Sequence, residues 1–196
     1  MIHSVFDYLR VELRDQLGVS DTQVSIGHLH TLQSSDINPG LRLALVNIAH
    51  ETSMRNQSHV TRTLAGQNFY KQPPVYLNLY ILMAFDFGTY QTDLIRLSQA
   101  MAFFQDKPFF ESENARASNP FPDELSRIIL DLHTVDFEKL NHIWGMLGGT
   151  YFPSAIYKAR LVKVDADNQV DATQIDEILV TSKFKTSNDS AESDQE

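Results

Sequence analysis

Histidine and carboxylate side chains are the groups in this sequence best suited to metal binding or proton transfer. His28 and His30 stand two residues apart in a segment with strand-like alternation, so both side chains leave one face, as two metal ligands would. A metal site needs three or four ligands, and no third ligand is evident near the pair. Surface histidines with ordinary hydrogen bonds explain the pair better.

Two other groups match chemical motifs only in part. His50 and Glu51 resemble the start of a zinc-protease helix, but the second histidine is missing four positions later and the segment is strand-like. Asp165, Asp167 and Asp171 resemble a calcium loop without its central glycine and closing glutamate. We reject the protease motif and interpret the aspartates as a solvated turn.

The sequence lacks the usual motifs of nucleophilic and nucleotide chemistry. It contains no G-x-S-x-G elbow, no G-x-x-x-x-G-K-[ST] loop and no G-x-G-x-x-G after a strand. It has no cysteine, which excludes disulfides and thiolate nucleophiles and fits a reducing compartment. We therefore expect no catalytic residue, no metal site and no cofactor.

Charge and apolar content limit the class of partner. The formal net charge of −9, from 16 basic and 25 acidic residues, repels a phosphate backbone, so we expect no nucleic-acid partner. The best apolar run, residues 75–87, carries Asn78 and Asp86 and is too short to cross a bilayer. Residues 1–18 lack the apolar stretch of a secretory signal, so we expect cytoplasmic folding without membrane insertion.

Apolar spacing predicts the elements that would position these side chains. Helical spacing indicates helices over residues 2–17, over 89–106, and after Asp136 as N-cap. Alternating or continuous apolar runs predict strands over residues 22–29, 41–48, 75–85, 125–135 and 151–164. This order predicts an α+β fold: a single domain with a mixed, mostly antiparallel sheet packed with helices.

Two strands stand out in the pattern. Residues 41–48 are apolar at both parities, which is typical of a central strand covered on both faces. Residues 75–85 alternate cleanly after Pro73 and Pro74, which cannot donate ladder hydrogen bonds. Tyr76 and Tyr80 lie on the other face of this strand, and aromatic side chains with polar tips favour subunit contacts.

The remaining segments divide the chain. Residues 51–72 are polar without a sustained period and are interpreted as a long excursion, in which Arg55 and Arg62 are suited to bidentate contacts with carboxylates. We assign residues 1–164 to one domain and 165–196 to a C-terminal extension. That extension contains one further strand at 174–184 and an acidic tail that we expect to be disordered.

Three stretches in this order and spacing carry a resemblance. They are HETSMRN at 50–56, PPVYLNLYILMAF at 73–85, and LNHIWGMLGGTYFPSAIY at 140–157. Together they resemble the N-terminal domain of the cap proteins of extracellular contractile injection systems, of the antifeeding-prophage and virulence-cassette type. The resemblance covers about residues 2–164.

The resemblance implies a phage tail-terminator-like fold and a structural role. Such a cap forms a hexameric ring on the end of the tube and the last sheath layer, and it carries no catalytic residues. The chain would then assemble in the bacterial cytoplasm and become part of an injection particle that can be released. The positions carried over as fold or contact residues are Glu51, Arg55, Asn56, Pro73, Pro74, Trp144, Tyr151, Ser154 and Tyr157.

A cap must also satisfy the exposed strand edges of a terminal layer, because open edges keep adding copies. Residues 174–184 are our candidate for a strand that pairs with another subunit. The interface candidates are Arg62, Tyr76, Tyr80, Ile178 and Val180. The alternatives are a baseplate or adaptor subunit of a phage-tail-like particle, a monomeric peptide-binding module, or a small metal-dependent enzyme using His28 and His30.

Overall fold

The described chain forms helices and strands that alternate along the sequence. The computed structural model describes residues 1–28, 39–51, 60–62, 68–71, 74–148, 150–164 and 169–171. The α-helices are α1 (Ile2–Leu17), α2 (Tyr90–Asp106) and α3 (Phe137–Met146), with short 3₁₀ helices η1 (Asp21–Gln23) and η4 (Ser112–Asn114). The strands are β1 (Val24–Ile26), β2 (Gly40–His50), β3 (Val60–Arg62), β4 (Asn68–Lys71), β5 (Val75–Asp86), β6 (Phe109–Phe110), β7 (Ile128–Leu132), β8 (Ser154–Val164) and β9 (Gln169–Asp171).

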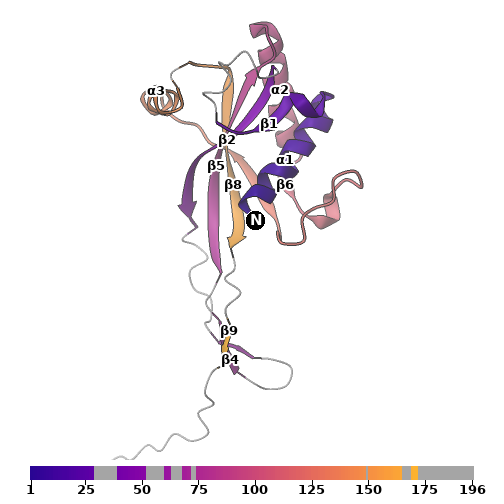
Figure 1. Ribbon diagram of the computed structural model, residues 1–196, viewed down its shortest axis with the longest axis vertical. Coiled ribbons are helices and arrows are strands. Elements are labelled where there is room, and N and C mark those ends of the chain that lie inside the picture. The colour runs from indigo at the N-terminus through magenta and orange to yellow at the C-terminus, as the bar shows by residue number, and fades with distance from the viewer. Residues whose placement is uncertain are drawn as a thin grey trace, which may run out of the picture.

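The main sheet has six strands in the order β1-β2-β5-β8-β7-β6. Only the β1–β2 pair is parallel, and the other four pairs are antiparallel. The three longest strands, β2, β5 and β8, lie side by side in its middle (Figure 1). The predicted α+β fold with a mixed, mostly antiparallel sheet is therefore confirmed.

A second sheet of β3, β4 and β9 lies beyond the free ends of β2, β5 and β8 (Figure 1). β4 pairs antiparallel with both β3 and β9. The predicted irregular excursion over residues 51–72 is thus wrong where it contains β3 and β4. The predicted strand at 174–184 and the disordered tail lie outside the described residues.

Helices cover both faces of the main sheet. α1 and α2 pack on one face over the larger core, to which β5 contributes Leu79, Ile81, Met83 and Phe85. α3 packs on the opposite face over a smaller cluster (Figure 1). The alternation in β5 therefore sends its apolar positions to the larger core, as predicted, and sends Leu82 and Ala84 towards α3.

The three predicted helices are present, with differences in their buried faces. α1 ends at Gly18, whose left-handed backbone (φ 61°) lets its N–H donate to the Arg14 carbonyl. In α2, Ala100, Phe103 and Phe104 are buried, while Leu94 is exposed. In α3 only Trp144 is buried, and Leu140 and Ile143 are partly buried against the same sheet face.

The strand at 41–48 is covered on both faces only in its first half. Leu41 to Ala44 are buried, whereas Leu45, Asn47 and Ile48 are exposed. The change occurs where β1 ends, because β1 pairs only with Leu41, Arg42 and Leu43. A continuous apolar run therefore did not predict a uniformly central strand.

A buried carboxylate joins α1 to the loop that follows α2. Glu12 is 0% exposed, accepts a hydrogen bond from Asn119 Nδ2 at 3.0 Å, and lies 3.5 Å from Lys107 Nζ. Arg116 Nε lies 3.6 Å from the same carboxylate. Two cations and an amide therefore compensate the buried charge, and residues 107–119 are held against the helix.

Replacing Glu12 by alanine leaves Lys107 and Arg116 near a buried cavity without their carboxylate. We expect Glu12→Ala to lower the free energy of unfolding by about 3 kcal/mol, measured by urea denaturation. Glu113→Ala is the matched control, because Glu113 is exposed on η4, and it should change stability by less than about 0.5 kcal/mol. Equal effects of the two substitutions would contradict a structural role for the buried charge.

Candidate functional site

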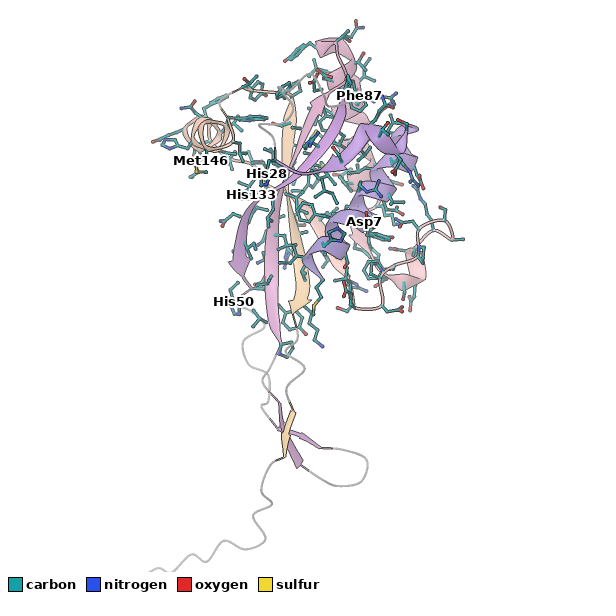
Figure 2. All side chains as sticks on the ribbon, in the orientation of Figure 1. Asp7, His28, His50, Phe87, His133 and Met146 are labelled. Carbon is teal, nitrogen blue, oxygen red and sulfur yellow. The ribbon has the colours of Figure 1, made fainter. Side chains whose placement is uncertain are left out.

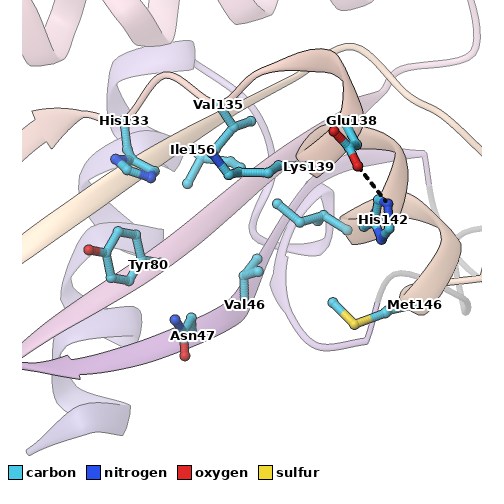
Figure 3. A pocket seen from close by; sticks show the side chains of 11 residues that line it. Val46, Asn47, Tyr80, His133, Val135, Glu138, Lys139, His142, Met146 and Ile156 are labelled. Carbon is cyan, nitrogen blue, oxygen red and sulfur yellow. Dashed lines mark ion pairs between the residues drawn. The ribbon is translucent and has the colours of Figure 1, made fainter.

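A groove of about 710 Å³ separates α3 from the sheet face below it (Figure 3). Its floor comes from β2, β5 and β8, and its wall comes from α3 and the segment before it. Its lining residues are Val46, Asn47, Tyr80, His133, Val135, Glu138, Lys139, His142, Ile143, Met146 and Ile156. Because side chains from three strands, α3 and the segment before it converge on this groove, we take it as the candidate site.

The start of α3 is fixed by a side-chain cap. Asp136 Oδ1 accepts the backbone N–H of Lys139 at 2.8 Å, and Lys139 Nζ lies 2.7 Å from Asp136 Oδ2. These hydrogen bonds from Lys139 lower the pKa of Asp136 below its usual value. The cap satisfies a free backbone donor at the helix N-terminus and sets where the groove wall begins.

The far end of α3 is anchored by Trp144. Its ring is buried against Ala44, Leu82 and Ile156 from the sheet. It also meets Tyr151 edge-on, with ring centroids 5.5 Å apart. Leu140 and Ile143 of the same helix are partly buried against this cluster, and Trp144 is the residue of α3 that is fully buried.

The lining chemistry favours binding of a side chain or chain segment. Tyr80 and His133 meet edge-on with centroids 4.9 Å apart, and His142 Nε2 lies 4.0 Å from Glu138 Oε1 (Figure 3). The rest of the lining is mostly aliphatic. In the described ranges, no three His, Asp or Glu side chains are grouped to hold a metal ion. An apolar floor with a few polar tips is typical of a peptide-binding surface.

The structure places some of the predicted fold residues together. Glu51, just after β2, accepts a hydrogen bond from Asn78 Nδ2 at 3.1 Å. Arg160 Nε lies 4.0 Å from the same carboxylate, and Arg160 Nη1 donates to Asp131 at 3.2 Å. This polar cluster ties the ends of β2, β5, β7 and β8 together.

Other predicted fold residues have different surroundings. Trp144 of α3 packs edge-on against Tyr151. Tyr157 is on the opposite face, buried 4.9 Å from Phe104 between ring centroids, and burial raises its pKa. Ser154 begins β8 opposite Ala84, and Pro74 is half-buried before β5. Arg55, Asn56 and Pro73 lie outside the described residues.

The interface candidates are only partly described. Tyr80 lines the groove, and Tyr76 is half-buried on the same strand. Arg62 belongs to β3, but its side chain is not described; Ile178, Val180, His30, Asp165 and Asp167 lie outside the described residues. Asp171 is in β9 without a described side chain, and His28 follows β1 on the surface.

Sequence reasoning missed most of the groove. His133, His142 and Met146 come from two segments on either side of Asp136, and Val46 is the extra residue of a bulge where the β2–β5 register shifts. Figure 2 shows His133 and Met146 on the same side of the molecule. The available signal was an apolar residue at the start of α3 that the helix leaves exposed. This residue is Phe137, which is 90% exposed.

The described helices also bear on membrane association. None of them is both long and apolar enough to cross a bilayer.

Comparisons with known proteins agree with this architecture. A family model described as the Pvc16 N-terminal domain matches residues 4–177. The chain is similar in structure to a PVC sheath/tube terminator of an extracellular contractile injection system in its extended state, with a TM-score of 0.60 and 16% identity. It is also similar to the tube-terminating cap of the anti-feeding prophage, with a TM-score of 0.59 and 14% identity.

These likenesses show the fold, which is the terminator-like fold expected from the sequence. The alignments cover 95% and 91% of this chain but 65% and 60% of the two structures. The chain therefore spans less than two thirds of the length of either protein. No curated protein sequence gives a significant match.

The burial of Trp144 between α3 and the sheet has a measurable consequence. We expect Trp144→Ala to lower the free energy of unfolding by about 3 kcal/mol, because it empties a packed aromatic site. Phe137→Ala removes an exposed ring of the same helix and should change it by less than about 0.5 kcal/mol. Far-UV circular dichroism in urea measures both, since Trp144 is the chain's only tryptophan and its fluorescence is lost. Similar stabilities of the two variants would show that α3 is held in another way.

Proposed function

The chain belongs to the Pvc16 N-terminal domain family, and on that premise we propose that it is the structural cap that closes the distal end of the tube and sheath of a bacterial contractile injection system. The observation that carries the proposal is the shared fold over 95% and 91% of this chain with two proteins described as a sheath/tube terminator and a tube-terminating cap. Both are named for ending a tube, and their fold accounts for nearly all of this chain.

We further propose that the cap works as a hexameric ring that contacts the last tube and sheath subunits. A ring of copies places the same surface at every subunit of a terminal layer and stops addition beyond it. The described surface offers contacts for such an assembly, because several large apolar side chains are exposed. These are Tyr90, Leu94, Ile95, Phe137, Met146 and Tyr151.

The proposed role is non-enzymatic. The groove lining combines aliphatic and aromatic side chains with three polar side chains of α3, which are Glu138, Lys139 and His142. Such a surface suits binding of a protein segment. The protein would assemble in the bacterial cytoplasm and then leave as part of the particle.

Deleting the gene tests the proposal in cells that produce the particles. Without a terminator, tube polymerisation has no stop, so negative-stain electron microscopy should show tubes of widely varied length. Supplying the gene on a plasmid should restore one length.

A strain that lacks a baseplate component is the control, because it should produce no particles at all. Particles of normal, uniform length in the deletion strain would refute the cap function. Absence of all particles would favour the baseplate or adaptor alternative.

A further inference from the structure

The second half of β2 has a free edge. β1 pairs only with Leu41, Arg42 and Leu43, and in the described part of the chain no strand lies beside residues 45–50 on that side. On the other side, β5 pairs with β2 as far as His50. An unpaired strand edge of this length is a template for another strand.

The backbone groups on this edge can be assigned. Glu51 donates its N–H to the Tyr76 carbonyl at 2.8 Å, towards β5. Because successive residues direct their N–H and C=O groups to opposite sides of a strand, His50 and Ile48 direct theirs outward. Ile48 N–H is met only by the side chain of its neighbour, Asn47 Oδ1, at 2.9 Å. The Asn47 amide therefore holds a donor that an incoming strand would use.

The free edge opens directly into the groove. Val46 and Asn47 belong to both, because they form the bulge in β2 and line the floor beside α3 (Figure 3). A strand added at this edge would place every second side chain beneath α3. There it would meet Val46, Ile143 and Met146. The free edge thus offers backbone pairing, which gives affinity for an added strand, and the apolar groove selects its side chains.

We propose that residues 174–184 of one copy add as a strand to this free edge of β2 in the next copy, with Ile178 and Val180 in the groove. The inference rests on the proposed ring and specifies how its neighbours are joined. In the sequence QIDEILVTSKF, Ile178 and Val180 have the same parity, so in a strand both side chains would enter the groove. Asp176, at that parity too, can approach the side that carries Lys139 and His142.

The direction of β9 favours a neighbour over the same chain. Gln169 pairs with Lys71, the end of β4 nearer β5, and Asp171 pairs with Phe69, farther away. β9 therefore runs away from the main sheet towards its last residue, Asp171 (Figure 1).

The reach of the segment agrees with this direction. Seven residues lead from Asp171 to Ile178 and span at most about 25 Å. Returning to the level of Tyr80 requires about 17 Å along β5 from Val75 and about 7 Å along β9, plus the separation of the two sheets. These two stretches alone use nearly all of that reach.

One donor and one acceptor per chain also give the right kind of assembly. Head-to-tail contacts of this type are heterologous, and they close into a ring when the rotation between copies permits. Each added strand would satisfy the outward groups of Ile48 and His50. A closed ring would then leave no β2 edge open to further growth.

Disulfide trapping between two populations tests the proposal, because the chain has no cysteine of its own. Ala49→Cys provides the acceptor, since Ala49 pairs with Asn78 and faces the groove side of the sheet. It is mixed with Ile178→Cys, Val180→Cys or Leu179→Cys, oxidised, and resolved on a non-reducing gel. We expect heterodimers with Ile178→Cys or Val180→Cys and at least tenfold less with Leu179→Cys, which has the opposite parity.

A second set of variants tests whether the ring forms, by measuring the native mass of the oligomer. Ile178→Asp combined with Val180→Asp should reduce the native mass to that of one chain, while Thr181→Asp, on the other parity, should leave the oligomer intact. Circular dichroism checks that the variants keep the fold of the unchanged chain.

Three results would overturn the inference. They are equal trapping at both parities, no disulfide between the two populations, and a ring that survives the double aspartate variant. Each would leave the cap function standing if the deletion strain still makes tubes of varied length. Uniform tubes in that strain would remove the cap function whatever the trapping shows.

Discussion

The structure depends on one constraint, which is that the backbone groups at the margins of its long strands need partners. β2, β5 and β8 extend well past the short flanking strands β1 and β7. Towards their common end, Asn78 of β5 and Arg160 of β8 approach the carboxylate of Glu51, which follows β2. The outer side of β2 is not closed by another strand in the described chain, and only Asn47 meets one of its donors. A protein that ends a polymer can use such an edge, because pairing it satisfies the edge and stops growth together.

The two faces of the sheet serve different purposes. α1 and α2 cover a large apolar core, and the buried Glu12 with its two cations fixes the loop after α2 against α1. On the opposite face, α3 is capped by Asp136 and anchored by Trp144, so it stands over the sheet without covering it. The rigid first face therefore supports a second face that remains available for contact.

The sequence predicted local elements well and long-range relations poorly. Helical spacing, the Asp136 cap and the alternation after Pro74 are local signals, and the helices and strands they indicate are present. The burial of β2 could not be predicted, because it depends on where β1 stops. The strands β3 and β4 could not be predicted either, because their segment has no apolar period. The groove was missed for the same reason. Its lining combines the bulge at Val46 with residues around Asp136, and only the fold brings them together.

The central claim is that this chain closes the end of a contractile particle, and a reconstruction of intact particles by electron cryomicroscopy tests it most directly. The account predicts density for six copies of this fold in one ring at the end opposite the baseplate, in contact with the last tube and sheath subunits. Density for the fold at the baseplate, or an end closed by another protein, would contradict it.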